Sequence, residues 1–462
     1  MKKANLKIVL CLSVLVASFV SSCKKDKAED EVAPETSTVL VGSSDARVTH
    51  DWQNTFLEIE RYAAVYRPCP TAHMLGYVGL GAYEACVPGM PAYKSLTPLY
   101  AGLNIPSQET SLEYHYPSVL NAYYASIYKK FFATVRAPDK TKIDSLRTAL
   151  ETVYASAASQ EVIDRSEAYG NSVADAIWAY ENTDIAGHDQ YLDPRPLSYA
   201  PPVGTGLWVP TPPGNQAAMF PYWGQVRAFA ITGAEKTCRP PLPYSTDQLS
   251  PYYAQGLEVY ALTTPQTAEH QWIAEFWSDD VLGFTFSPPA RWIAITNEVL
   301  DEQHSNLETA VLAGVKVGLA LNDAAIGCWN SKYIYNVERP ATYIVNVMGK
   351  NTWNVAALTS THFVSSTPSF PAYPSGHSTF GGAAAEALSS VFGFSYHMTD
   401  RCHQNRTDFN GAPRSFSSFY EMAEENAYSR LYLGVHWRMD CEEGLRYGYE
   451  IGRKVENLPF KK

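Results

Sequence analysis

Apolar residues recur at three- and four-residue spacing along most of this chain, which is the spacing of one buried face of an α-helix. The pattern predicts helices over 51–65, 71–86, 111–135, 140–158 and 160–180. It returns from residue 251 onward, over 266–277, 291–303 and 308–332. We find no series of alternating apolar and polar residues that would predict a sheet. The chain is therefore expected to be all-α and built of helical bundles.

A proline- and glycine-rich stretch from Asp193 to Tyr222 interrupts this pattern. Prolines inside a segment remove backbone donors and break helices, so we expect a long non-helical connection here. The stretch lies within an expected N-terminal helical region, residues 46–250, and precedes an expected C-terminal helical domain, residues 251–462.

The N-terminus has the pattern of an export signal. Three lysines within the first seven residues precede an apolar run over 8–20, which is too short to span a membrane. Two serines then lead to Cys23, and this segment resembles a bacterial lipoprotein box. We therefore expect a signal peptide over 1–22, acylation of Cys23, and a flexible tether over 23–45. The protein would then be exported and anchored by lipid to a bacterial membrane, on its periplasmic or cell-surface face; plain secretion is the alternative. No later stretch is expected to span a membrane.

The composition favours a globular protein with a large core, because 46% of the 462 residues are hydrophobic and 18% are charged. A formal charge of −11 argues against a nucleic-acid partner, which requires a basic surface. It also makes any cluster of basic residues informative. Beyond the signal region there are six cysteines, and they are expected either to pair as disulfides or to be buried free thiols. Their spacing does not suit zinc.

Three short segments carry charged or nucleophilic groups. In the first, Lys332 and Arg339 lie seven residues apart, so on one helix they share a face, and Pro340 would end that helix. The alternative is a helix end with two ordinary surface cations.

In the second segment, two prolines precede Ser375, Gly376 and His377, and an apolar helical pattern follows. These three residues are therefore expected at a helix N-terminus, where free backbone N–H groups bind anions. The alternative is an ordinary serine cap beside an incidental histidine.

In the third segment, Arg430 is followed by His436 and Asp440, and the last two are one helical turn apart. Asp440 can accept a hydrogen bond from one ring nitrogen of His436, which fixes the tautomer and makes the other nitrogen a better ligand or nucleophile. The alternative is a surface histidine–carboxylate pair.

Taken in order, the three segments resemble the signature of the phosphatidic acid phosphatase type 2 and vanadium haloperoxidase superfamily. The matching residues are Lys332, Arg339, Pro340, Pro374, Ser375, Gly376, His377, Ser429, Arg430, His436 and Asp440. The resemblance implies a haloperoxidase/acid-phosphatase-type helical core with an added N-terminal helical region. It also implies that Lys332, Arg339 and Arg430 lie in one pocket. Two cations ~6 Å apart repel by about 3 kcal/mol at an effective dielectric of ~20. A trianionic tetrahedral ligand is the natural occupant of such a pocket.

Several residues make the chain more similar to the peroxidases than to the phosphatases of this superfamily. Trp329 and Phe370 resemble the aromatic residues of the halide pocket in vanadium chloroperoxidases, although core packing is the ordinary use of such side chains. Algal bromoperoxidases typically have a histidine in place of Phe370. The segment around Asp280 resembles a haloperoxidase segment, which makes Asp280 a candidate partner for Arg430.

The resemblance implies a vanadium-dependent haloperoxidase, which oxidises halide with hydrogen peroxide to hypohalous acid, with vanadate as the cofactor. It implies that His436 is the vanadate ligand, oriented by Asp440, and that His377 is the acid–base group. Lys332 would polarise peroxide. The groups that hold the oxyanion would be Lys332, Arg339, Ser375, Gly376 and Arg430.

Two alternatives remain. In a phosphomonoesterase, His436 would be the nucleophile and the pocket would need no vanadate. In a non-enzymatic surface binding protein the pocket would be a scaffold, but such a protein has no need of both His377 and His436. None of these three functions involves nucleic acid, and we expect the protein to contact a membrane only through its lipid anchor.

Overall fold

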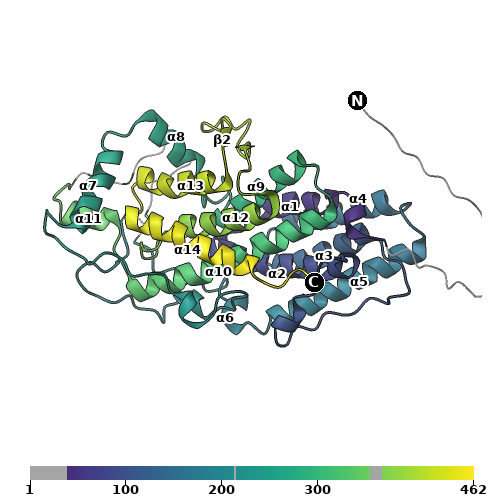
Figure 1. Ribbon diagram of the computed structural model, residues 1–462. Helices are drawn as coiled ribbons and strands as arrows, with labels where there is room; N and C mark the ends of the chain where they lie inside the picture. The colour runs from purple at the N-terminus through teal and green to yellow at the C-terminus, as the bar shows by residue number, and fades with distance from the viewer. Residues whose placement is uncertain (1–38, 213–214, 352, 354, 356–366) are drawn as a thin grey trace, which may run out of the picture. The chain divides into compact units, whose positions relative to one another are not determined.

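The all-α prediction is confirmed by the computed structural model, which describes residues 39–212, 215–351, 353, 355 and 367–462 (Figure 1). The first helices are α1 (Arg47–Glu60), α2 (Cys69–Cys86), α3 (Tyr116–Phe131), α4 (Ala137–Tyr154), α5 (Gln160–Glu181) and α6 (Ile185–His188). The later ones are α7 (Pro251–Thr263), α8 (Ala268–Phe276), α9 (Pro288–Glu302), α10 (Leu307–Tyr335), α11 (Pro340–Asn346), α12 (Gly376–Phe392), α13 (Phe419–Leu433) and α14 (Arg438–Glu456). The predicted signal peptide, Cys23 and most of the predicted tether lie outside the described residues.

Short elements complete the structure. The 3-10 helices are η1 (Val41–Ser43), η2 (Ala64–Tyr66), η3 (Val87–Gly89), η4 (Thr97–Leu99), η5 (Trp223–Gln225) and η6 (Gly233–Lys236). The strands β1 (Met398–Asp400) and β2 (Arg414–Phe416) pair antiparallel, with Met398 opposite Phe416. They form a small hairpin between α12 and α13, and the core remains helical.

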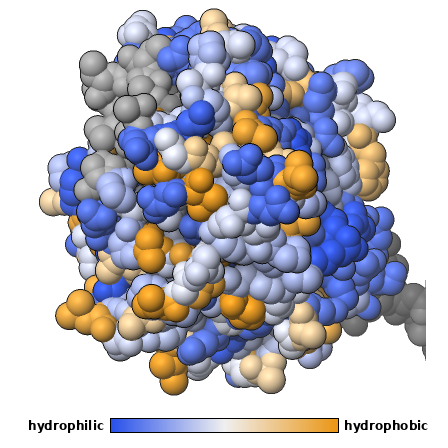
Figure 2. Space-filling view, turned by 90° about the vertical axis from the view of Figure 1, so that its left-hand side faces the viewer, coloured by the Kyte–Doolittle hydropathy of each residue, from blue (hydrophilic) through white to orange (hydrophobic). Residues whose placement is uncertain are grey.

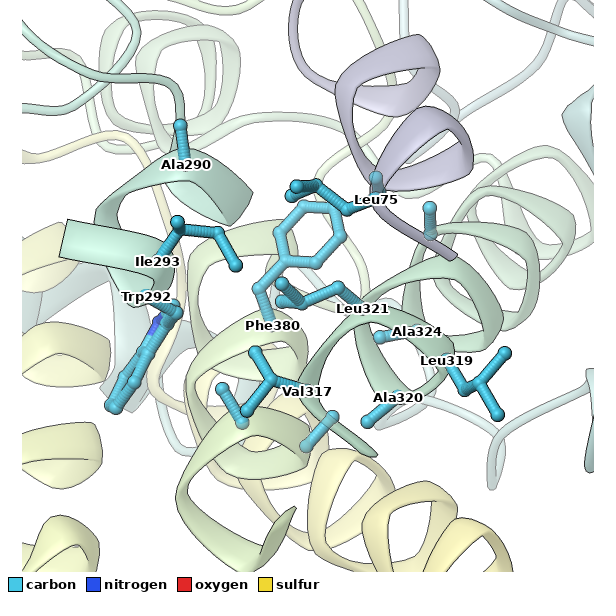
Figure 3. Close-up of a cluster of buried hydrophobic side chains, with 14 of the residues drawn as sticks. Leu75, Ala290, Trp292, Ile293, Val317, Leu319, Ala320, Leu321, Ala324 and Phe380 are labelled. Carbon is cyan, nitrogen blue, oxygen red and sulfur yellow. The ribbon is translucent and has the colours of Figure 1, made fainter. Parts of the chain in front are cut away.

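Helix α10 is the central element of the core. It packs along α2 on one side and α12 on another, and α12 in turn packs along α14 (Figure 1). In Figure 3, Leu75 of α2, Ile293 of α9, Leu321 of α10 and Phe380 of α12 point into one apolar cluster. The residues of the three signature segments lie on or beside α10, α11, α12, α13 and α14, so these helices hold the site.

Contrary to expectation, one helix after the signal region is long and apolar enough to cross a membrane. This is α10, and within its most apolar window 89% of the residues are buried inside the protein. Its composition reflects burial of most of its surface among other helices, which leaves little of the usual polar face.

Glycines allow two of the helix pairs to approach closely. A Cβ at Gly318 of α10 would lie 2.3 Å from the carbonyl oxygen of Leu75 in α2. A Cβ at Gly448 of α14 would lie 2.4 Å from the carbonyl oxygen of Thr379 in α12. Any larger residue would push the backbones apart, and with them the side chains that they carry.

The predicted connection is confirmed, and it is longer than expected. Between α6 and α7 the described residues contain 3-10 turns and no α-helix. Asp323 of α10 anchors this connection, because its carboxylate accepts hydrogen bonds from the backbone N–H groups of Phe229, Ala230 and Ile231 at 2.7–3.0 Å. The connection therefore packs on the central helix. The predicted boundary at residue 250 stays a prediction.

The six cysteines that follow the signal region are free thiols, so the second of the two expectations is the one observed. Five are buried and Cys402 is partly exposed.

Hydrophobic side chains at the surface are dispersed. Figure 2 views the side on which α7 and α11 lie in Figure 1, and it shows several small hydrophobic patches separated by hydrophilic residues. Leu249 and Leu257 are among the exposed apolar residues near α7. Patches of this size are normal for a globular protein.

Candidate active site

The first signature segment does not form one helix, so the predicted shared helix face of Lys332 and Arg339 is wrong. Helix α10 ends at Tyr335, and Asn336 follows in the left-handed conformation with φ of 48°. Arg339 is extended, and Pro340 is the first residue of α11. A proline is favourable at this position because its missing N–H would have no partner there. Pro340 therefore begins a helix instead of ending one, and the turn at residues 336–339 brings Arg339 back toward the end of α10.

Lys332 lies in the last turn of α10 and is completely buried. Its ammonium group donates to the carbonyl oxygens of Pro371 and Ala372 at 2.9 Å and of Pro374 at 2.5 Å. An ammonium has three N–H groups, so these carbonyls occupy all of them. Burial lowers the pKa of Lys332 to about 8. Lys332 thus fixes the loop before α12 and contributes its charge to the site.

Arg339 connects two segments of the site. Its Nε and Nη2 donate to the Phe370 carbonyl oxygen at 3.0 and 2.9 Å, and its Nη1 donates to the Val435 carbonyl oxygen at 2.8 Å. The same Nη1 lies 3.1 Å from Nε2 of His436. Burial lowers the pKa of Arg339 to about 10. Arg339 therefore places a positive charge against Nε2 of His436.

The second segment begins α12 as predicted. Ser375 is the N-cap, and its hydroxyl oxygen accepts a weak hydrogen bond from the Ser378 N–H at 3.4 Å. Gly376 and His377 are the first two residues of the helix, where backbone N–H groups have no partner within the helix. A Cβ at Gly376 would lie 3.3 Å from the Trp329 ring. Glycine thus keeps this helix end accessible beside the aromatic wall.

His377 is held between a cation and a carbonyl group. Arg430 Nη1 lies 3.4 Å from His377 Nε2, and arginine can only donate, so Nε2 is the acceptor. The other ring nitrogen, Nδ1, then carries the proton that His377 donates to the Asp279 backbone. Burial, followed by the charges of Arg430, Lys332 and Arg339, holds the pKa of His377 well below its usual value. His377 is therefore neutral in this arrangement.

Arg430 lies in the last turn of α13 and is buried. Its Nε donates to the Ser429 hydroxyl at 2.9 Å, and its Nη2 donates to the Trp277 carbonyl oxygen at 2.6 Å. Burial lowers its pKa to about 10, and the nearby charge of Asp279 partly opposes this.

Asp280 is not the partner of Arg430, so this prediction was wrong by one position. Asp280 has a positive φ of 88°, and its carboxylate lies 3.4 Å from Arg67 Nε. The neighbouring Asp279 acts on Arg430 instead, and burial raises the pKa of Asp279 to about 7. The turn at Asp280 directs the two side chains differently, which a sequence pattern does not reveal.

The predicted pair of His436 and Asp440 is present and buried. His436 lies just before α14, and its Nδ1 is 2.8 Å from Asp440 Oδ2. Because Asp440 accepts at Nδ1 while Arg339 donates to Nε2, the proton of the neutral ring is on Nδ1. Burial and the charges of Arg339 and Lys332 hold the pKa of His436 well below its usual value. The lone pair on Nε2 therefore faces the cations.

A cavity of about 290 Å³ lies against these residues. Its wall includes Gly376, His377, Arg430 and His436 from the signature segments. Trp329 and Phe370 also line it, with ring centroids 5.0 Å apart, and the Trp329 Nε1–H is a buried donor without a hydrogen-bond partner among the described residues. The cavity thus combines cations, histidines and aromatic rings.

The remaining predicted residues lie around this cavity in different ways. Asp280 is in the wall, whereas Lys332, Arg339, Ser375 and Asp440 lie behind it and act through charge and through the groups that they hold. Sequence reasoning missed Asp279 and Arg195, both of which line the cavity. No motif marks Arg195, since it lies in the proline-rich connection.

Comparison with known proteins places this geometry among related molecules. Residues 313–459 match the family model of the VCPO second helical-bundle domain. The vanadium chloroperoxidase of Curvularia inaequalis is 25% identical over an alignment of 355 positions, which covers 60% of this chain and 58% of that protein's length. Two bacterial crystal structures are also similar. A vanadium-dependent iodoperoxidase has a TM-score of 0.77 and 28% identity, with 90% of this chain and 96% of that one covered. A holo-type vanadium-dependent chloroperoxidase has a TM-score of 0.63 and 15% identity, with 84% and 91% covered, which supports the fold.

Proposed function

Because this chain is similar to vanadium haloperoxidases in sequence and in fold, we propose that it belongs to their family and oxidises a halide ion with hydrogen peroxide to hypohalous acid, with vanadate as its cofactor. The observation that carries the proposal is the state of His436. Its Nδ1 donates to Asp440, and its Nε2 lone pair lies at a cavity beside buried cations. This is the state in which an imidazole binds a metal centre, with its other nitrogen held by a carboxylate.

The residues present fit a tetrahedral oxyanion. Lys332, Arg339 and Arg430 are buried cations, and burial lowers the pKa of each. The carboxylates of Asp440 and Asp279 near them have pKa values raised to about 7, so together they do not balance the three positive charges. An anion in the cavity would supply the missing negative charge, and the free N–H groups at the start of α12 favour it further.

Bound vanadate would supply a Lewis-acidic centre that activates hydrogen peroxide, so that halide, peroxide and one proton give hypohalous acid and water. The chain's own residues would bind the oxyanion and orient it. His436 provides the Nε2 ligand, and Asp440 keeps it in the required tautomer. Arg430 and the Gly376 N–H, which line the cavity, would hold oxyanion oxygens, while Arg339 and Ser375 support the site from behind its wall.

His377 is suited to move the proton. Three cations and burial hold its pKa down. An anion in the cavity would offset those cations and raise the pKa, so His377 would gain a proton as the anion binds. A histidine in this position can then act as the acid–base group at the oxyanion.

Trp329 and Phe370 would form the wall that the halide contacts. Both rings are buried at the cavity, and the unpartnered Nε1–H of Trp329 is a donor suited to an anion. The relatives that match this chain include both a chloroperoxidase and an iodoperoxidase, so each halide needs to be measured.

The test is reconstitution of purified protein with orthovanadate, followed by oxidation of iodide, bromide and chloride by peroxide. Hydrolysis of a generic phosphomonoester is measured in parallel. Vanadate-dependent halide oxidation supports the proposal, whereas phosphatase activity that vanadate inhibits, with no halide oxidation, would falsify it. His436→Ala should abolish the activity. His397→Ala, which removes an exposed histidine outside the cavity, is the matched control.

We also propose that the protein is exported and held on a bacterial membrane through an acylated Cys23. The support is the sequence pattern at residues 1–23, which lie outside the described residues. Cys23→Ser should move the protein from the detergent phase to the aqueous phase in a phase-partition assay and abolish labelling by a fatty-acid probe. Cys11→Ser, inside the expected signal peptide, should change neither. Unchanged partitioning and labelling of Cys23→Ser would contradict the anchor.

A further inference from the structure

The wall of the cavity contains a further cation, Arg195, that no signature segment includes. It comes from the proline-rich connection, far in sequence from the site residues. Arg195 is partly exposed, whereas His436 in the same wall is only 2% exposed. The cavity therefore leads from Arg195 on the outer side toward the buried His436.

The backbone around Arg195 is stiff. Arg195 stands between Pro194 and Pro196, and the ring of a proline restricts both its own φ and the residue before it. The Pro194 carbonyl oxygen also accepts a hydrogen bond from the Phe220 N–H at 2.8 Å. The chain thus loses little freedom when Arg195 contacts a ligand.

The side chain of Arg195 is held from two segments. Its Nη1 donates to the Ala217 carbonyl oxygen at 2.7 Å and to the Ser369 hydroxyl at 2.5 Å. Its Nη2 donates to Gln216 Oε1 at 2.8 Å. These contacts use three N–H groups, and a guanidinium has five, so two remain for a ligand.

The charge of Arg195 is not neutralised by an ion pair. All three of its acceptors are uncharged, and no carboxylate among the described residues forms a salt bridge with it. Its partial burial lowers its pKa, but an arginine stays protonated at neutral pH. A preorganised positive charge with free donors thus lies at the outer part of the cavity.

We propose that Arg195 is an anion-recruiting residue at the cavity mouth, which draws the halide substrate in toward Trp329 and Phe370. This proposal rests on the proposed function. The chain has a formal charge of −11, so an approaching halide meets net repulsion, and a local cation at the entrance offsets it. Hydrogen peroxide and hypohalous acid are neutral, so the same charge neither attracts the co-substrate nor retains the product.

Because Arg195 would attract the halide but not the neutral peroxide, the KM values for iodide and for peroxide are measured separately. Arg195→Gln removes the charge and keeps a donor for the neighbouring oxygens. In vanadate-loaded protein at low ionic strength, we expect the KM for iodide to rise about fivefold, a modest size for electrostatic steering at one charge. The KM for peroxide and the kcat at saturating iodide should stay within about twofold. Salt should erase the difference, because the Debye length falls to about 8 Å at 0.15 M ionic strength.

A second measurement does not depend on turnover. Orthovanadate is also an anion and would enter through the same mouth, so its rate of association with metal-free protein should fall in Arg195→Gln by a similar factor. Tryptophan fluorescence after rapid mixing gives this rate. Arg195→Lys keeps the charge, so its iodide KM and its rate of vanadate association should both lie close to the wild-type values. Arg47→Gln removes the same charge from an exposed site on α1 outside the cavity and should leave both quantities unchanged.

The outcomes are distinct. A higher iodide KM with unchanged peroxide KM, restored by lysine, supports the proposal. An unchanged iodide KM in Arg195→Gln at low salt overturns it. Equal losses in every kinetic constant, together with a lower melting temperature, also overturn it, since Arg195 would then be only structural. If the wild-type protein oxidises no halide but vanadate association still slows in Arg195→Gln, the proposed function fails and anion recruitment stands.

Discussion

Replacing Asp440 by asparagine removes one negative charge from behind His436 with almost no change in side-chain volume. Asp440 Oδ2 accepts from His436 Nδ1 at 2.8 Å and from the Trp437 N–H at 3.0 Å. A hydrogen bond to a charged group contributes about 1.5–3 kcal/mol. Each 1.4 kcal/mol is tenfold in affinity, so vanadate should bind about 10- to 100-fold more weakly to Asp440→Asn.

The assay is equilibrium binding of orthovanadate at pH 8, measured by calorimetry. This pH is chosen because burial raises the pKa of Asp440 to about 7, and the carboxylate must carry its charge in the wild-type protein. Asp323→Asn is the matched control. Asp323 is also a buried carboxylate that accepts backbone N–H groups, but the residues that donate to it do not line the cavity, whereas Asp440 holds His436 in the wall. It should lower stability and leave the vanadate Kd within about twofold.

Unchanged affinity in Asp440→Asn would refute the reasoning, because it would mean that the carboxylate does not support the Nε2 lone pair. An equal loss of affinity in Asp323→Asn would refute it as well, since the effect would then come from general destabilisation.

Three further predictions concern proton transfer, packing and pH. His377→Gln should lower kcat by about 10²- to 10⁴-fold with little change in vanadate Kd, and a normal kcat would exclude His377 as the acid–base group. Gly448→Ala should cost about 1–3 kcal/mol, because its Cβ would lie 2.4 Å from the Thr379 carbonyl oxygen. Gly314→Ala, whose Cβ would meet only an atom 3.7 Å away, should be neutral or stabilising in the same denaturant titration. Burial raises the pKa of Glu338 to about 7, so the folded state favours its protonated form and stability falls as pH rises from about 4.5 to 7. Glu338→Gln should therefore gain stability over wild type across that range, by up to about 3 kcal/mol at pH 8, and a pH-independent difference in melting temperature would contradict this.

Much of the site could be predicted because its chemistry is local in sequence. The start of α12 follows from the prolines before Ser375 and the apolar helical pattern after it. Asp440 reaches His436 because four residues make about one helical turn. Interactions of this kind depend on a few neighbouring residues, so the pattern alone identified them.

Errors arose where neighbouring residues allow more than one local structure. A proline after Arg339 is compatible with either the end or the start of a helix, and in the structure Pro340 begins α11. Asp279 and Asp280 are equivalent in sequence, and only the turn at Asp280 shows that it contacts Arg67 while its neighbour acts on Arg430.

Helical periodicity and signature spacing lie in short segments, so the all-α fold, the resemblance to vanadium haloperoxidases, and the histidines and cations of the pocket could be predicted without a structure. Which of these groups meet depends on how the helices and the connection pack in three dimensions. This packing buries Lys332 among three carbonyl oxygens, places Arg339 against His436, and brings Arg195 from the proline-rich connection to the same cavity. These contacts join residues 39 or more positions apart, so they depend on how whole helices pack, and no local pattern encodes them.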